Sequence, residues 1–177
     1  MRRAPGAHAL VLVLALASLP CVPRLAAARD IRHAPAVRGL QPGTATLINQ
    51  ARERSATVRA LVDVLNSSDL VVYVDYRPYL DFPTACTSFL AAFGGHRYLL
   101  VSINPRHTVE DRIALLGHEL EHAVEIAGAA EVADQETFRR FYLGRASDAA
   151  ATTHYETAAA RRAEEMVRRE LQLRAGG

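Results

Sequence analysis

The chain has 177 residues, 50% of them hydrophobic, with 21 basic and 19 acidic side chains and a formal net charge of +2. This length suits one domain with an ordinary core and excludes a second substrate-binding domain. The balanced charge gives no case for nucleic-acid binding, which needs a clustered basic face. Arginine without lysine, together with abundant alanine, is typical of a GC-rich bacterial genome.

Residues 1–28 are predicted to be a secretory signal peptide. Two arginines precede an uncharged apolar run, ALVLVLALASL, and Ala26-Ala27-Ala28 fits the small-x-small cleavage pattern. The run is shorter than the roughly 20 apolar residues of a membrane span. We therefore expect a secreted or periplasmic protein without a stable membrane anchor after cleavage; an uncleaved N-terminal anchor is the alternative. Cleavage removes three arginines and no acid, so the formal charge falls from +2 to −1.

The first half of the mature chain is predicted to hold one helix and three strands. Residues 29–43 contain prolines and glycines without periodicity and indicate a linker. Apolar residues at helical spacing predict a helix over 44–66. LVVYVDY, residues 70–76, predicts a strand, and TSFLAAF and HRYLLVSIN around Gly94-Gly95 predict a hairpin. Cys86, the one cysteine after residue 28, is expected to be a small buried side chain.

The second half is predicted to be helical. Thr108 with Asp111 three residues on is a capping pattern, and Gly128 is a stop signal, so a helix is expected over about 108–127. EVADQETFRRFYL predicts a shorter helix, and a long final helix is expected from about His154. The fold class is therefore α+β, with an N-terminal helix, a short three-stranded sheet and a C-terminal helical part.

His118-Glu119-Leu120-Glu121-His122 lies in the middle of the helix predicted over 108–127. Residues four apart on a helix are about 40° apart around its axis, so His118 and His122 can bind one metal ion. Zn²⁺ accepts imidazole nitrogens and keeps one position for water in catalytic sites. Glu119 lies one step round the helix, where it can take a proton from that water. The alternative is a surface helix that carries these residues by chance.

This motif resembles that of the zincin metallopeptidases. The resemblance covers the motif helix and, more loosely, the strand RYLLVSIN before it and the final helix. It implies a zincin-like domain over residues 44–177, zinc ligands at His118 and His122, and a general base at Glu119. It also implies that residues 98–103 line the cleft and pair with extended substrate.

The third zinc ligand is expected to be Glu156. On a helical wheel Glu156 heads an apolar stripe that includes Ala160, Ala163 and Val167, and a buried carboxylate needs a partner. The competing interpretation is a capping box formed by Thr153 and Glu156. Further candidates are Asp148, His154 and Asp134, whereas Glu125 is expected to be a supporting or surface residue. The resemblance favours a glutamate ligand from a downstream helix, often followed four residues later by a histidine-orienting aspartate, and residue 160 is alanine.

The sequence therefore predicts an exported zinc metallopeptidase that hydrolyses peptide or protein substrates. Peptide hydrolysis also needs a group that stabilises the oxyanion, for which His154, Tyr155 and Tyr142 are candidates. Two alternatives stay open: a zincin-like protein that binds zinc without catalysis, and a cell-envelope module whose helices bind a partner protein.

Overall fold

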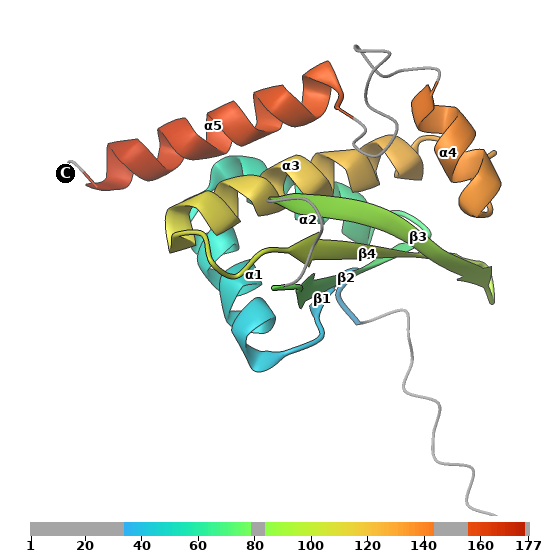
Figure 1. Cartoon of the computed structure of the whole chain (residues 1–177), viewed down its shortest axis with the longest axis horizontal. Coiled ribbons are helices and arrows are strands. Elements are labelled where there is room, and N and C mark those ends of the chain that lie inside the picture. Colours follow the sequence, from blue (N-terminus) through green and yellow to red (C-terminus); the bar gives the residue numbers. More distant parts are fainter. Residues whose placement is uncertain (1–33, 79–83, 144–155, 176–177) are drawn as a thin grey trace, which may run out of the picture. The chain divides into compact units, whose positions relative to one another are not determined.

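A computed structural model describes residues 34–78, 84–143 and 156–175. The predicted signal peptide lies outside these residues, as do Asp148, Thr153, His154 and Tyr155. The fold described here belongs to Pro35–Gly177. It is α+β, as predicted, and its described part contains five helices and one four-stranded sheet (Figure 1). No described helix is long and apolar enough to cross a membrane.

The sheet has the strand order β1-β2-β4-β3. The strands are β1 (Val37–Gly39), β2 (Leu70–Tyr76), β3 (Ala85–Phe93) and β4 (His96–Ile103). β1, β2 and β4 run parallel, and β3 pairs antiparallel with β4. The sequence predicted three strands, so the sheet has one more than expected. The additional strand is β1, which lies inside the predicted linker and is too short to show an alternating pattern.

The hairpin between β3 and β4 is confirmed. Gly94 and Gly95 form its turn with φ angles of 60° and 78°. Residues without a β-carbon adopt this left-handed backbone without a steric penalty, which is why a two-glycine turn is a hairpin signal. The alternating apolar residues of β4 face the core, and Leu99, Val101 and Ile103 are fully buried.

The predicted first helix is two helices. α1 (Pro42–Arg54) and α2 (Ala56–Asn66) meet at Ser55, whose backbone is extended. The Ser55 hydroxyl accepts a hydrogen bond from the amide of Val58 and donates one to the Glu170 carboxylate. A serine with this role is a typical helix N-cap, and a carboxylate beside it is favourable at the positive end of a helix. The break therefore depends on a contact with a distant part of the chain.

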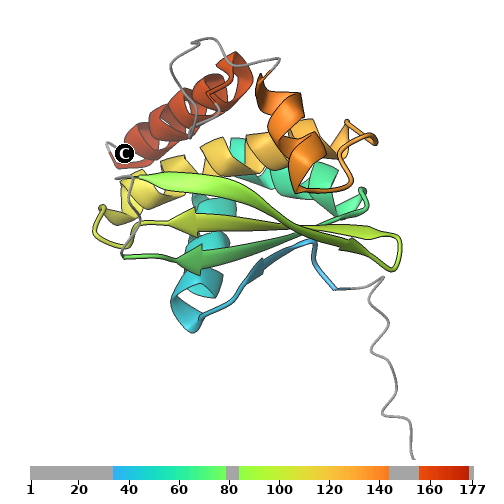
Figure 2. The ribbon, with the colours of Figure 1, turned by 45° about the vertical axis from the view of Figure 1, so that its right-hand side comes forward.

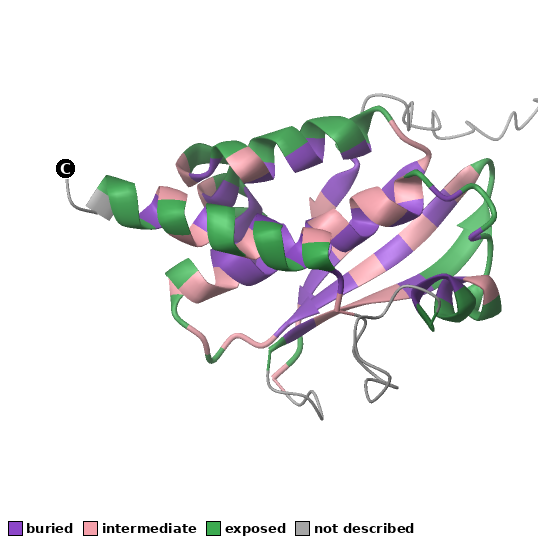
Figure 3. Cartoon of the chain, turned by 90° about the horizontal axis from the view of Figure 1, so that it is seen from above, coloured by how far each residue is buried: buried purple, intermediate pink, exposed green. Residues whose placement is uncertain are grey.

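α3 (Val109–Ala127) lies between the sheet and α5 (Ala158–Ala175), as Figures 1 and 2 show. α4 (Gln135–Leu143) packs beside β3. The Thr108 hydroxyl caps α3 by accepting from the amide of Asp111, and the helix stops at Gly128, as the sequence predicted. Figure 3 looks onto α5 and shows exposed positions beside a buried stripe, which contains Ala160, Ala163, Val167 and Leu171.

Arg97 fixes the C-terminal end of α3 to the sheet. Its Nη1 donates to the carbonyls of Ile126, Ala129 and Val132 at 2.9, 2.6 and 3.2 Å. Its Nε and Nη2 bind the two carboxylate oxygens of Asp69 at 2.8 and 2.7 Å, and this hydrogen-bonded pair lowers the pKa of Asp69. A buried cation at the negative end of a helix satisfies carbonyls that the helix leaves without donors. The motif helix is therefore held at its C-terminal end by the first residues of β4.

Candidate metal and catalytic site

The histidine-glutamate motif lies on the buried part of α3. His118, Glu119 and His122 have exposed fractions of only 6%, 5% and 4%. Apolar side chains anchor the same helix in the core, since Ile113, Leu116 and Leu120 are fully buried. Buried polar side chains need hydrogen-bonding partners, and each of the three has a carboxylate or hydroxyl beside it.

Glu119 is held by the edge strand β3. The hydroxyl of Thr87 donates to Oε2 of Glu119 at 2.7 Å. Burial raises the pKa of the Glu119 carboxyl above its usual range, while His122, His118 and the Thr87 hydrogen bond oppose this shift. A raised pKa and a fixed orientation make a buried carboxylate a better proton acceptor than an exposed one.

Both histidines are oriented through Nδ1. Nδ1 of His118 lies 3.1 Å from Oε2 of Glu164, and Nδ1 of His122 lies 3.0 Å from Oε2 of Glu125. Because each Nδ1 is engaged by a carboxylate, Nε2 is the nitrogen that each ring can offer to a metal ion. The predicted supporting position of Glu125 agrees with this contact.

Carboxylates also control the charge of His118. Burial works against a charged ring, but the hydrogen bond with Glu164 and the nearby Glu119 and Glu156 carboxylates together raise the pKa of His118. The same hydrogen bond with His118, supported by one from Arg168, lowers the pKa of Glu164. The site is therefore an environment that favours positive charge at the ring, whether from a proton or from a cation.

Glu156 lies beside His118, although not on the helix predicted for it. α5 begins at Ala158, four residues later than expected, and its cap is Thr157, whose hydroxyl accepts from the amide of Ala160 at 3.1 Å. Glu156 thus precedes the helix. Its Oε1 is 3.5 Å from Nε2 of His118, and its side chain is 44% exposed, so the expectation of a buried carboxylate on the apolar stripe is wrong.

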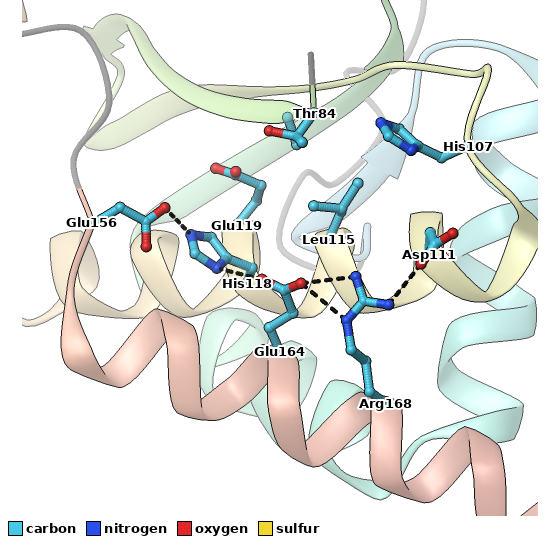
Figure 4. Close-up of a pocket in the computed structure, with 10 residues that line it drawn as sticks. Thr84, His107, Asp111, Leu115, His118, Glu119, Glu156, Glu164 and Arg168 are labelled. Atoms are coloured by element: carbon cyan, nitrogen blue, oxygen red, sulfur yellow. Dashed lines mark hydrogen bonds and ion pairs between the residues drawn. The ribbon is translucent and has the colours of Figure 1, made fainter. Parts of the chain in front are cut away.

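A cavity of about 350 Å³ lies beside His118 and Glu119, between α3, α5 and the start of β3 (Figure 4). Glu156 and Glu164 approach His118 from two sides, and Glu119 lies beside the same ring. The cavity lining consists of Thr84, Ala85, His107, Asp111, Leu115, His118, Glu119, Glu156, Glu164 and Arg168. The hollow is therefore rich in titratable groups and open to a ligand beside the motif.

Residues 34–78, 84–143 and 156–175 contain no complete group of three or more His, Cys, Asp or Glu side chains arranged to hold a metal ion. The partial arrangement is still close to what zinc requires. With zinc–ligand bonds of about 2.0–2.1 Å in a tetrahedron, two ligand atoms are about 3.4 Å apart and two imidazole centroids about 5 Å apart. Nε2 of His118 lies 3.5 Å from Oε1 of Glu156, and the ring centroids of His118 and His122 are 4.9 Å apart. The residue types are therefore those that zinc binds, and these two distances are near those of a zinc site, but the described side chains as placed form no complete site.

The other residues predicted as zinc ligands or oxyanion donors are either outside the described residues or have structural roles. Asp148, His154 and Tyr155 lie outside the described residues. Asp134 caps α4, because its Oδ1 accepts from the amide of Thr137 at 2.7 Å. Tyr142 is buried, and its hydroxyl donates to the His122 carbonyl at 3.1 Å, so it supports the motif helix from the side of α4.

The expectation that residues 98–103 pair with substrate is wrong. β4 is a central strand whose two edges are paired with β2 and β3. Among the described strands, β3 is the one at the edge of the sheet next to α3, and Thr87 brings it to Glu119. The hairpin signal predicted both strands but not which of them lies outside, because strand order depends on the parallel pairing of β2 with β4.

Sequence reasoning missed Thr87, Glu164 and Arg168. Thr87 belongs to a strand, and its contact with Glu119 has no local signal. Glu164 and Arg168 are four residues apart beside the apolar stripe of α5, which reads as an ordinary surface ion pair. The one signal for Glu164 in the sequence is its position next to the apolar stripe of α5, where a carboxylate needs a partner.

Comparisons of this chain with models of protein families, with curated proteins and with solved structures found no match. The case for a function therefore rests on the site itself.

Proposed function

We propose that this chain is an exported zinc metallopeptidase of the zincin type. The observation that carries the proposal is the pair of buried histidines on one turn of α3, each with Nδ1 bound to a carboxylate, beside a buried glutamate. Imidazoles oriented by carboxylates in this way are typical of protein zinc sites. His118, His122 and Glu156 would hold the ion.

The chemistry is hydrolysis of a peptide bond. When bound, zinc supplies an acidified water and a Lewis acid for a carbonyl oxygen. Glu119 would take the proton from the attacking water as the new C–O bond forms, and would pass it to the leaving amine when the peptide C–N bond breaks. Thr87 keeps the carboxylate of Glu119 in one orientation through the 2.7 Å hydrogen bond.

Peptide or protein substrate would lie along β3, the edge strand at the cavity. Exposed edge strands bind extended polypeptide through their backbone groups. The start of β3 contributes Ala85 to the cavity lining, and Thr87 contacts the proposed base. This is the substrate role that the resemblance had assigned to residues 98–103.

The proposal of export rests on residues 1–28, in which two arginines are followed by an apolar run and then by small residues at the expected cleavage site. N-terminal sequencing of protein recovered from the periplasm or medium should give a start near Arg29. Recovery of exported protein that begins at Met1 would contradict it.

The test of catalysis compares Glu119→Gln with Glu121→Gln on zinc-loaded protein and a peptide library. Glu121 is on the same turn of α3 and half-buried, which makes it a matched control. Glu119→Gln should retain zinc and lose roughly 10²–10⁴-fold in cleavage rate, whereas Glu121→Gln should cleave like wild type. Unimpaired cleavage by Glu119→Gln contradicts the mechanism. A zinc-loaded wild-type chain that cleaves nothing favours the zincin-like protein without catalysis.

A further inference from the structure

A chain of hydrogen-bonded charges runs from His118 to the start of α3. Oε2 of Glu164 is 3.1 Å from Nδ1 of His118, and Oε1 of Glu164 accepts from Nε and Nη2 of Arg168 at 3.1 and 2.9 Å. Nη1 of Arg168 then donates to Oδ1 of Asp111 at 2.6 Å, as Figure 4 shows. The other carboxylate oxygen of Asp111 accepts from the hydroxyl of Thr108, the cap of α3. The network therefore connects α5 both to the first turn of α3, at Asp111, and to the motif, at His118.

Each member of this network fixes the next. Arg168 binds Glu164 with two nitrogens, which limits rotation of the carboxylate. A fixed carboxylate accepts the Nδ1 proton of His118 and so selects the ring tautomer that has its lone pair on Nε2. The same hydrogen bond also restricts rotation of the ring.

We infer that Glu164 is the positioning residue for His118 and that Arg168 holds Glu164 in place. This inference rests on the proposed function, because a fixed tautomer at His118 matters when Nε2 binds zinc. His118 would then be contacted from both sides: Glu156, just before α5, lies 3.5 Å from its Nε2, and Glu164 on α5 lies 3.1 Å from its Nδ1.

The same helix contains a natural control. Glu165 and Arg169 have the same spacing as Glu164 and Arg168, but Nη2 of Arg169 lies 3.4 Å from Oε2 of Glu165. Their side chains are 67% and 73% exposed, against 25% and 41% for Glu164 and Arg168. Exposed pairs of this kind contribute little to stability. If Glu164 acts on His118, replacing Glu164 should therefore change the properties of His118, whereas replacing Glu165 should not.

The test measures two properties of the mature chain and its variants. The first is zinc affinity, by competition with a chelator. The second is the tautomer of the neutral His118 ring in metal-free protein, by ¹⁵N NMR well above the usual histidine pKa of about 6.5. Glu164→Ala should weaken zinc binding roughly 10–100-fold, the usual effect of losing such a partner, and should shift the tautomer away from Nδ1–H. Glu165→Ala should change neither property.

Two further variants sharpen the result. Glu164→Gln keeps the shape of the side chain and should give an intermediate loss of zinc affinity. Arg168→Met should lower zinc affinity less than Glu164→Ala does, while Arg169→Met should leave it unchanged. Wild-type affinity and tautomer in Glu164→Ala would overturn the inference, as would equal losses in Glu164→Ala and Glu165→Ala.

Failure of the proposed function gives a different pattern. If the wild-type chain binds no zinc, the metallopeptidase proposal fails and the NMR measurement alone decides the role of Glu164. An Nδ1–H tautomer that is lost in Glu164→Ala then supports positioning of His118, and an unchanged tautomer overturns it.

Discussion

Gly117 directly precedes His118, and its replacement tests whether close packing of α5 on α3 builds the site. A β-carbon at Gly117 would lie 2.7 Å from Cγ2 of Val167 on α5. Carbon atoms pack best at about 3.5–4.0 Å, and a valine side chain in a helix has one strongly preferred rotamer. The contact can therefore be relieved only if α5 moves or Val167 leaves its rotamer.

The expected change in the free energy of unfolding is the difference between two effects. Glycine to alanine within a helix stabilises by about 1 kcal/mol, whereas overpacking of a core costs about 1–3 kcal/mol. Gly117→Ala should thus lower the free energy of unfolding by up to about 2 kcal/mol. In a Val167→Ala background the clash is gone, because the next contacts of the added carbon are 3.7 Å away. There the same replacement should stabilise by about 1 kcal/mol.

The assay is a double-mutant cycle by denaturant unfolding of the metal-free mature chain. The predicted coupling between Gly117→Ala and Val167→Ala is roughly 1–3 kcal/mol. Gly117→Ala should also weaken zinc binding, since α5 contributes the carboxylate beside His118. A stabilisation of about 1 kcal/mol by Gly117→Ala in both backgrounds, with no coupling, would refute the close-packing argument.

Three further predictions concern other parts of the fold. Arg97→Met should lower the free energy of unfolding by at least about 2 kcal/mol in a denaturant titration, because buried carbonyls at the end of α3 lose their donor; an unchanged midpoint would contradict this. Cys86 is partly rather than fully buried, and this burial raises the pKa of its thiol to about 11. In the mature chain beginning at Arg29, iodoacetamide should therefore react with it at pH 8 far more slowly in native than in unfolded protein. Equal rates would be the opposing result. Glu156→Ala should weaken zinc binding with little effect on the metal-free melting temperature, whereas Thr157→Ala should lose about 0.5–2 kcal/mol of stability as a lost cap and keep its zinc affinity. The reverse pattern would remove Glu156 from the ligand set.

The parts of the fold that the sequence predicts well have strong local signals. The motif helix has a threonine cap, a glycine stop and a continuous apolar face, and β2 matches the predicted residues 70–76. The turn at Gly94-Gly95 requires left-handed backbone that glycine adopts readily. Each of these elements is determined by residues close together in the chain.

The parts that the sequence does not predict depend on contacts between distant residues. The break at Ser55 is stabilised by Glu170, which is more than a hundred positions away. The start of α5 at Ala158 is a different case, because its cap, Thr157, is local. The sequence has a second threonine, Thr153, near the expected start, and the local pattern does not choose between the two.

The candidate site divides in the same way. His118, Glu119 and His122 follow from the spacing of one motif on one helix. The contacts of Thr87 and Glu164 with this motif arise only when β3 and α5 pack on either side of α3. A sequence pattern can therefore predict the candidate pair of histidines but not the groups that orient it.

The most direct test of the central claim is the zinc stoichiometry of the mature chain, measured beside His118→Ala and His122→Ala. We predict one zinc ion per wild-type chain and loss of that ion in each variant, because two protein ligands would be left at most. His107→Ala is the control, since His107 lines the same cavity at its far end from the motif and should not change the stoichiometry. No zinc on the wild-type chain, or full retention of zinc in both motif variants, would contradict the account.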